Sequence, residues 1–293
     1  MQLIDKLILG TVQLGLEYGI NNSSGKPTTE QAVSLLEFAY KSGVRYLDTA
    51  EAYGNAQEVI GNYHKTNPSS PFNIITKCKK GNETLPHTDF LKNYLKNLEQ
   101  LYVPKLEAYL FHSYEQYKTF SNWDVLYEMQ ETGKLNRLGV SVYTNEEAIE
   151  VAKDERISIV QLPFNLLDNS AQRGFVLEVL KKNNREVHTR SVFLQGLFFK
   201  DRATLDKVKP LQSNLEQLDK IAAHCNCDLN LLALSYAFRQ SLIDKVLIGV
   251  DSIEQLKANI NSLDKVGSID FKTIEEIDQI KVSAVSFLNP STW

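Results

Sequence analysis

Short apolar or β-branched runs alternate along the chain with longer stretches in which apolar residues recur at helical spacing. The short runs are predicted strands, and they cover residues 7–9, 46–47, 73–76, 108–111, 137–140, 157–160, 186–189 and 245–248. Strands that alternate with helices are typical of parallel α/β folds, because a parallel connection needs a crossover that usually contains a helix. Eight such strands in one uninterrupted chain predict a (β/α)8 TIM barrel, with residues 1–293 forming a single domain.

Polar residues mark where helices are expected to begin. Thr28 and Gln31 form the pattern of a capping box ahead of a helix that stops near Gly43. The apolar face of that helix comprises Ala32, Leu35, Leu36 and Ala39. Further helix starts are expected at Asn55, Thr88, Asn145 and Ser252. The helix after Thr88 is expected to place Leu91, Tyr94, Leu95 and Leu98 on one face. The interval 196–245 leaves room for extra helices before the eighth strand, and a short tail ends the chain.

An open, doubly wound sheet is the competing architecture. Such a sheet usually carries a Gly-x-Gly-x-x-Gly turn after its first strand, where the backbone approaches a dinucleotide. Here the first strand is followed by Gly10, Thr11, Val12, Gln13, Leu14 and Gly15, which is a different pattern. A nicotinamide cofactor would therefore be held by another design.

Polar side chains stand at almost every predicted strand end. They are Thr11, Asp48, Lys77, His112, Ser141, Gln161 and Arg190 with Ser191, and the eighth strand ends at Gly249. Taken alone, a strand-end carboxylate often caps a helix and a strand-end lysine is often solvated. In a TIM barrel, however, these positions meet at one end, where active sites are built. The pattern therefore indicates one polar site at the barrel mouth.

Tyr53 lies in the loop after Asp48, where it can fold back over the barrel mouth. A phenol has an ordinary pKa of about 10 and donates a proton poorly at neutral pH unless a cation stabilises its ionised form. Lys77 can supply that cation, and Asp48 can hold the lysine in place. His112 can donate a hydrogen bond to a carbonyl oxygen. Together these groups suit the protonation of a carbonyl oxygen during its reduction.

At this point the chain resembles the aldo-keto reductases, over almost its whole length. The matching segments, in the order of the family, are LILGTVQLG, GVRYLDTAEAYG, IITK, YLFHS, LGVS, VQLPFN, RSVFLQGLF and IGVDSIEQLKAN. Asp48, Tyr53, Lys77 and His112 match the catalytic tetrad of the family. The resemblance implies a TIM barrel that binds a nicotinamide cofactor in extended form. It also implies that Tyr53 protonates the carbonyl, Lys77 lowers the pKa of Tyr53, Asp48 orients Lys77 and His112 positions the substrate.

Cofactor residues are implied by the same resemblance. Ser141 and Gln161 match positions that bind the nicotinamide carboxamide, Asn165 matches a polar position just beyond, and Asn259 matches the residue that contacts adenine. Val142 stands where many members have Asn. Arg190 stands where many members stack an aromatic ring on the nicotinamide, and a guanidinium plane can also stack on a ring. The remaining positions matched to the cofactor are Gly10, Thr11, Ser191, Phe193, Gln195, Gly249, Asp251 and Gln255.

The segment after the eighth strand departs most from the family. NADP(H) is the usual cofactor of the family, and its 2′-phosphate needs cationic partners there. Ser252 and Gln255 stand where cations are common, and Asp251 would repel a phosphate. A carboxylate suits a ribose 2′-hydroxyl instead. NAD(H) use is therefore a hypothesis to test.

Composition narrows the class of protein. Hydrophobic residues make up 43% and charged residues 23%, so the chain can bury a large core. The net charge of -4 offers no broad basic surface for nucleic acid or anionic lipid. Neither a secretory leader nor a long uncharged apolar segment is evident, which favours a cytoplasmic location without membrane contact. Cys225 and Cys227 form a Cys-x-Cys pair beside His224, short of the roughly four ligands of a structural metal site, so packing is the expected role.

The leading functional hypothesis is NAD(P)H-dependent reduction of an aldehyde or ketone on a small polar molecule, such as a sugar, by a monomer or weak oligomer. One alternative is a cofactor-binding regulatory or sensing subunit with weak reductase activity. Another is a lyase in which Lys77 forms a Schiff base. The substrate pocket is expected to be shaped by residues 17–27, by residues 114–123 and by the tail 286–293. Phe287 and Trp293 of that tail either cover the mouth or pack on the barrel exterior.

Overall fold

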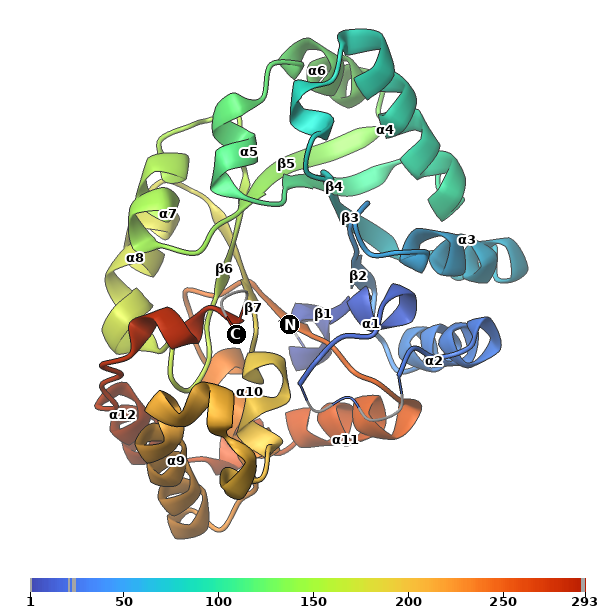
Figure 1. Ribbon diagram of the computed structural model, residues 1–293. Coiled ribbons are helices and arrows are strands. Elements are labelled where there is room, and N and C mark those ends of the chain that lie inside the picture. Colours follow the sequence, from blue (N-terminus) through green and yellow to red (C-terminus); the bar gives the residue numbers. More distant parts are fainter. Residues whose placement is uncertain (1, 21, 23–24, 291–292) are drawn as a thin grey trace.

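The computed structural model describes residues 2–20, 22, 25–290 and 293. Within these residues the strands are β1 (Leu7–Gly10), β2 (Tyr46–Asp48), β3 (Asn73–Lys77), β4 (Leu106–Phe111), β5 (Leu135–Ser141), β6 (Ile159–Pro163), β7 (Glu186–Arg190) and β8 (Lys245–Ile248). Each strand runs parallel to its neighbours, and β8 pairs with β1 to close the barrel (Figure 1). The predicted eight-stranded TIM barrel is confirmed for the described part of the chain.

Helices surround the barrel on its outer side (Figure 1). They are α1 (Val12–Gly15), α2 (Thr29–Lys41), α3 (Ala56–Thr66), α4 (His87–Leu101), α5 (Tyr114–Thr119), α6 (Trp123–Glu131), α7 (Asn145–Ala152), α8 (Ser170–Lys182), α9 (Gln212–His224), α10 (Leu229–Phe238), α11 (Ile253–Leu263) and α12 (Phe271–Asp278). Short 3-10 segments are η1 (Leu3–Lys6), η2 (Asn82–Thr84), η3 (Leu194–Phe199), η4 (Arg202–Thr204), η5 (Asp206–Leu211), η6 (Val266–Ser268) and η7 (Val285–Leu288). No described helix combines the length and apolar composition that a membrane span requires.

The sixth strand lies later in the chain than its apolar run predicts. Ile157 and Ser158 precede β6, because the Ile157 amide closes a turn by donating to the Asp154 carbonyl at 3.0 Å. The strand itself begins at Ile159 and ends at Pro163. As a result Gln161 lies within β6, where it is in register with Ser141 of β5.

Helix starts agree with the sequence where the capping pattern is complete. Thr28 caps α2, since its hydroxyl accepts from the Gln31 amide at 3.2 Å while the Gln31 side chain accepts from the Thr28 amide at 2.9 Å. The predicted apolar face of α2 is buried. Ser252 caps α11 by accepting from the Gln255 amide at 3.3 Å.

One expected helix start was wrong, and the helix that begins at Asn145 as predicted has a different capping residue. α4 begins at His87 after Pro86, so Thr88 lies inside the helix. A proline just ahead of a helix supplies a fixed φ without needing a partner for its nitrogen. Leu95 was expected on the apolar face of α4 but is 40% exposed, whereas Phe90 of the same helix is buried. α7 is capped by Thr144 rather than Asn145, because Thr144 forms the capping box with Glu147.

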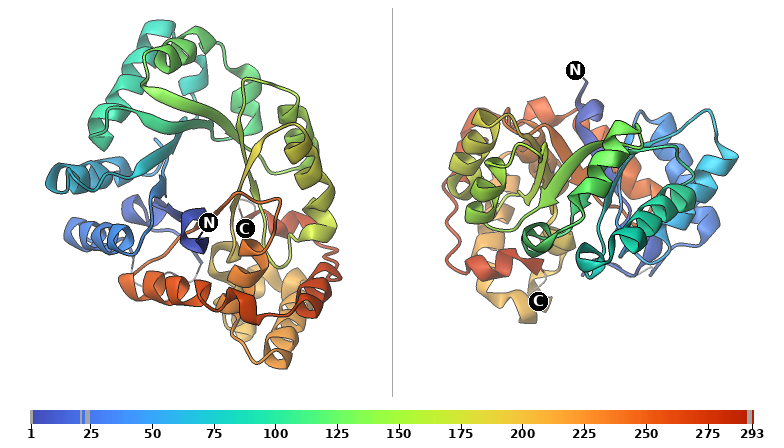
Figure 2. Two further views of the ribbon diagram at one scale, coloured as in Figure 1. Left: turned by 180° about the vertical axis from the view of Figure 1, so that it is seen from behind. Right: turned by 90° about the horizontal axis from the view of Figure 1, so that it is seen from above.

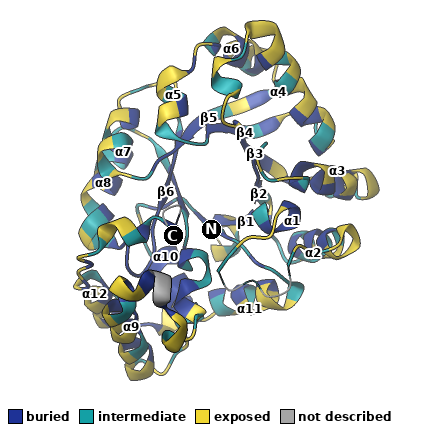
Figure 3. Ribbon diagram, viewed as in Figure 1, coloured by how far each residue is buried: buried dark blue, intermediate teal, exposed yellow. Residues whose placement is uncertain are grey.

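Buried side chains form two apolar regions. A small cluster fills the middle of the barrel and comprises Ile8, Ile75, Ala108, Leu110 and Ile159. A much larger core lies between the strands and the helices, whose outer faces are exposed (Figure 3). Because apolar side chains fill the barrel, its mouth forms a closed pocket rather than a channel.

The extra helices expected before the last strand are present as α9 and α10, and they lie beside α12 in Figure 1. Asn169 holds the end of α12, since its side-chain amide donates to the Ile277 and Ile280 carbonyls at 2.8 and 3.1 Å. The N- and C-terminal segments lie at opposite ends of the barrel (Figure 2). The C-terminal segment therefore reaches the same end as the strand termini, where Pro290 borders the mouth.

Candidate active site

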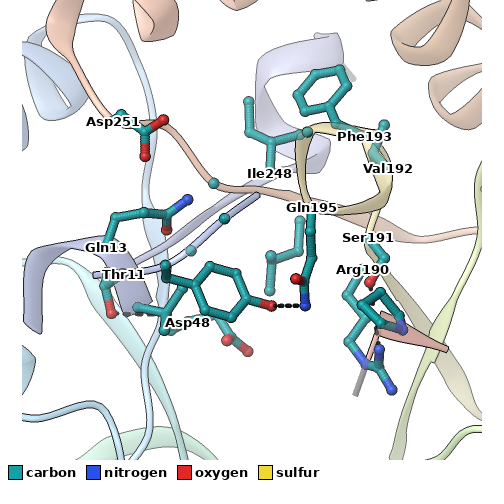
Figure 4. Close-up of a pocket in the computed structure, with 18 of the residues that line it drawn as sticks. Thr11, Gln13, Asp48, Arg190, Ser191, Val192, Phe193, Gln195, Ile248 and Asp251 are labelled. Carbon is teal, nitrogen blue, oxygen red and sulfur yellow. Dashed lines mark hydrogen bonds between the residues drawn. The ribbon is translucent and has the colours of Figure 1, made fainter. Parts of the chain in front are cut away.

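A cavity of about 620 Å³ opens at the C-terminal ends of the strands. Every residue that the sequence assigns to the tetrad lines it: Asp48, Tyr53, Lys77 and His112. All positions matched to the cofactor except Asn165 line it as well: Gly10, Thr11, Ser141, Gln161, Arg190, Ser191, Phe193, Gln195, Gly249, Asp251, Gln255 and Asn259. Several of these residues are shown in Figure 4. The structure thus brings together in one cavity residues from strand ends that lie far apart in the sequence.

Asp48 and Lys77 form a buried ion pair at the ends of β2 and β3. The second carboxylate oxygen of Asp48 accepts from the Gln161 side-chain amide at 2.9 Å. Lys77 also donates to the Thr49 carbonyl at 3.3 Å. Burial lowers the pKa of Lys77, and the adjacent Asp48 opposes that shift. Since both oxygens of Asp48 are engaged, its carboxylate fixes the lysine ammonium in one position.

Tyr53 faces this ion pair from the loop after β2. Its ring centroid lies 5.5 Å from the Lys77 Nζ atom and 5.7 Å from the His112 ring centroid. Burial raises the pKa of Tyr53, and the charge of Asp48 raises it further. Burial therefore dominates the pKa of Tyr53 in the protein alone, and the lowering of this pKa by Lys77 stays a prediction.

His112 is uncharged at neutral pH. Burial lowers its pKa to about 4, and the positive charge of Lys77 acts in the same direction. The backbone amide of His112 donates to the Gln116 side chain at 2.8 Å, which fixes the end of β4. A neutral imidazole beside Tyr53 can donate a hydrogen bond to a ligand oxygen without adding a charge.

Arg190, at the end of β7, lies over the end of β5. Its guanidinium donates to the Val142 carbonyl at 3.2 Å and to the Ser141 hydroxyl at 3.4 Å. The guanidinium carbon lies 4.2 Å from the centroid of the Tyr143 ring. No carboxylate pairs with Arg190 among the described residues. Its positive charge is therefore held at the cavity by hydrogen bonds and an aromatic face.

The loop after β7 has a strained backbone. Ser191, Leu194 and Gln195 all have left-handed φ angles, of 62°, 47° and 56°. Each such angle costs a non-glycine residue roughly 1 kcal/mol, and strain of this kind is concentrated at functional sites. The Gln195 side chain donates to the Tyr18 hydroxyl at 2.7 Å across the mouth. These turns carry Ser191, Phe193 and Gln195 to the cavity wall.

The opposite end of the cavity carries negative charge. Figure 4 shows Asp251 and Gln13 on the side away from Arg190. One carboxylate oxygen of Asp251 and the side-chain oxygen of Gln13 are buried without a hydrogen-bond partner among the described residues. Burial raises the pKa of Asp251. Lys77 and Arg190 are the cations among the described lining residues, so none lies near Asp251.

Several positions considered for the site do not line the cavity, and the expectation that residues 114–123 shape it was wrong. Asn165 lies outside the cavity and fixes its own loop by accepting from the Leu167 amide at 2.9 Å. Ser252 also lies outside, as the cap of α11. Residues 114–123 contribute no described residue to the lining, because α5 packs beside β4 and β5. Phe287 and Trp293 pack against the core, and the Trp293 indole donates to the Phe287 carbonyl at 3.0 Å.

Other lining residues were missed at first. Gln13 and Tyr143 each lie two residues beyond the polar strand-end positions Thr11 and Ser141, so including two further residues at each of these ends would have found them. Tyr18 lies in the segment 17–27 that was expected to shape the pocket. Asp228 and Asn230 come from the start of α10. The sequence gives no signal for them, because α10 is an addition to the repeating strand and helix pattern.

Comparisons with known proteins agree with this geometry. A family model described as Aldo/keto reductase family matches residues 6–282. The chain is 23% identical over 253 residues to a protein of Escherichia coli (strain K12) named NADH-specific methylglyoxal reductase, a match that covers 74% of this chain and 77% of that protein. It is 29% identical over 127 residues to a protein of Bacillus subtilis (strain 168) named glyoxal reductase, with 43% of this chain and 46% of the relative covered.

A solved structure shows the same fold. It is an aldo-keto reductase enzyme from a Medee basin deep-sea metagenome library, with a TM-score of 0.69 and 19% identity over 95% of this chain and 91% of that chain. At this identity the likeness concerns the fold. The family model, in contrast, spans most of the chain and includes every strand of the barrel. The protein therefore belongs to the aldo/keto reductase family and is an NAD(P)H-dependent oxidoreductase.

Proposed function

We propose that this protein reduces small aldehydes to alcohols, with NADH as its preferred cofactor and Tyr53 as the proton donor. The observation that carries the proposal is the convergence of Tyr53, His112 and the Asp48–Lys77 ion pair at the inner end of one cavity. Methylglyoxal and glyoxal are the first substrates to test, because two relatives are named as reductases of these compounds. Aldose sugars remain candidates of the same chemical class.

The cavity suits an extended nicotinamide cofactor. At one end, Gln161 is fully buried and its side-chain oxygen has no partner among the described residues. The NH2 group of the nicotinamide carboxamide can donate a hydrogen bond to this oxygen. The nearby Ser141 hydroxyl can donate a hydrogen bond to the carboxamide oxygen. At the other end, Asp251, Gln255 and Asn259 offer polar groups to the adenosine. The unsatisfied Gln161 oxygen thus supports a carboxamide at the inner end.

In this assignment the nicotinamide supplies a hydride to the carbonyl carbon. Tyr53 gives its proton to the carbonyl oxygen, and His112 donates a hydrogen bond that holds that oxygen beside Tyr53. Lys77 stabilises the negative charge that develops on the tyrosine oxygen. The raised pKa of Tyr53 keeps the phenol protonated at neutral pH, which is the form that reduction requires.

The preference for NADH rests on the charge at the outer end of the cavity. A 2′-phosphate there would meet Asp251, and no described cation lies near it. The unpartnered oxygen of Asp251 is instead an acceptor suited to a ribose hydroxyl. The Escherichia coli relative is named as NADH-specific, which supports the same preference.

The cofactor preference is tested by steady-state reduction of methylglyoxal with each cofactor, followed by the loss of nicotinamide absorbance. We expect kcat/KM to be higher with NADH by about tenfold or more, since juxtaposed like charges cost on the order of several kcal/mol. Asp251→Ser should lower the ratio of kcat/KM with NADH to kcat/KM with NADPH, because it should improve the use of NADPH. Asp264→Ser makes the same change in charge at the end of α11, away from the cavity, and should leave the ratio unchanged. A wild-type preference for NADPH would contradict the assignment.

A further inference from the structure

The turn between α9 and α10 brings two thiols into contact. Cys225 follows α9, and Cys227 lies two residues later, before Asp228 caps α10. Their Sγ atoms are 2.8 Å apart. Asn226 between them has a left-handed φ of 51°, which reverses the chain so that both thiols lie on one side. The close contact therefore results from the backbone of the turn.

Backbone hydrogen bonds fix this geometry. The Cys225 amide donates to the Ile221 carbonyl, and the Cys227 amide donates to the Ala222 carbonyl, both at 3.0 Å. Both thiols are half-buried at the edge of the core, so a small molecule can reach the pair. A disulfide bond needs sulfur atoms about 2.05 Å apart, so bond formation requires only a small movement of the two side chains.

Metal binding does not account for the pair. A structural zinc or similar ion needs about four ligands. Among the described residues no group of three or more His, Cys, Asp or Glu side chains is arranged to hold an ion. The catalytic assignment does not use these thiols either, since neither lines the cavity.

We propose that Cys225 and Cys227 are a redox-active pair that forms an intramolecular disulfide by exchange with a small-molecule disulfide such as oxidised glutathione. The Cys225 thiolate attacks the external disulfide, forms a mixed disulfide and releases one small thiolate. Cys227 then transfers its proton to that thiolate, and its sulfur attacks the Cys225 sulfur and releases the second small thiolate. Two protein thiols are oxidised to one disulfide, and one small disulfide is reduced to two thiols.

Burial raises the pKa of Cys227 to about 12, and the adjacent Cys225 and the charge of Asp228 act in the same direction. We therefore expect Cys225 to attack first, and the serine variants described below test this order. The third cysteine, Cys78, is fully buried, and burial raises its pKa as well. It serves as an internal reference thiol that should not react.

The pair adjoins the cavity in the sequence. Asp228 follows Cys227 directly, and both Asp228 and Asn230 line the cavity. The Asp228 side chain also accepts from the Leu231 amide at 2.7 Å to cap α10. A disulfide in the turn would therefore form next to the backbone that carries these two residues.

The experiment incubates the folded, reduced protein with oxidised glutathione, alkylates the remaining thiols under denaturing conditions and maps the products by mass spectrometry. We expect a peptide with a Cys225–Cys227 disulfide, about 2 Da lighter than the reduced peptide, and an alkylated Cys78. Cys227→Ser should accumulate glutathione on Cys225, whereas Cys225→Ser should react much more slowly. The wild-type peptide map keeps the proposal testable if either variant folds poorly.

Three results would overturn the proposal. One is a wild-type protein in which Cys225 and Cys227 both remain alkylated after incubation. Another is a wild-type reaction that stops at the mixed disulfide. The third is equal accumulation of glutathione in the two serine variants, because it would remove the distinct roles of the two thiols. None of these results depends on reductase activity, so failure here leaves the proposed function intact.

Discussion

His112 and Tyr53 respond in opposite directions to the same burial. A buried imidazole resists gaining a proton, so the pKa of His112 falls to about 4. A buried phenol resists losing one, so the pKa of Tyr53 rises. Both side chains are therefore neutral donors at neutral pH, and both can serve one carbonyl oxygen. Burial is the largest cause of both pKa shifts, with the charge of Lys77 adding to the shift at His112 and the charge of Asp48 adding to the shift at Tyr53.

The lowered pKa of His112 predicts a pH effect on stability. Between pH of about 6.5 and about 4, the unfolded chain binds a proton at His112 that the folded protein does not bind. The wild-type free energy of unfolding should therefore fall as pH decreases through this window, and His112→Gln should remove that part of the decrease. Urea unfolding at a series of pH values measures the difference, and superimposable curves for wild type and His112→Gln would refute the assignment.

At the scale of elements, the position of Tyr53 depends on a close backbone contact between α1 and the loop after β2. A Cβ atom on Gly15 would lie 1.9 Å from the Tyr53 carbonyl oxygen and 2.7 Å from the Ala56 nitrogen. The Tyr53 carbonyl in turn accepts from the Ala56 amide at 3.0 Å, which starts α3. Glycine at position 15 therefore lets the loop lie against α1 and fixes the direction of the tyrosine.

Gly15→Ala is predicted to damage both stability and catalysis, because the added methyl group must displace the Tyr53 backbone. We expect a loss of roughly 1–3 kcal/mol in the free energy of unfolding, as for other overpacked sites. We also expect a decrease in kcat for aldehyde reduction. Gly174→Ala is the matched control, since a Cβ there has no neighbour within 4 Å in α8, and it should stabilise by roughly 0.5–1 kcal/mol. Full activity in Gly15→Ala would show that the contact does not position Tyr53.

At the scale of the whole molecule, the alternation of strands and helices was enough to predict the barrel and to bring its strand ends together. The same reasoning failed where a local contact changed the pattern. The turn at Asp154 moved the start of β6, and Pro86 moved the start of α4. Asp228 and Asn230 could not be found from strand ends, because they lie on a helix outside the repeat. The raised pKa of Tyr53 could not be predicted either, since it depends on burial and on the partner of Lys77.

The charge distribution also has meaning only in the folded molecule. A net charge of -4 excludes little beyond nucleic acid and anionic lipid as main partners. Figure 4 shows Arg190 on one side of the cavity and Asp251 on the other. In the proposed assignment a dinucleotide would therefore meet a cation near its reactive ring and an anion near its adenosine. This polarity links the cofactor preference to the arrangement of all strand ends.

Tyr53→Phe shows whether Tyr53 protonates the substrate while NADH is bound. The measurement pairs NADH binding, followed by cofactor fluorescence, with the single-turnover rate of methylglyoxal reduction. We predict unchanged NADH affinity and a rate lower by about 10²–10⁴-fold, the usual contribution of a general acid. Tyr102→Phe, at an exposed site, should behave as wild type. A Tyr53→Phe rate equal to that of wild type would contradict the account, and a wild-type protein that binds NADH without turnover would favour a sensing subunit instead.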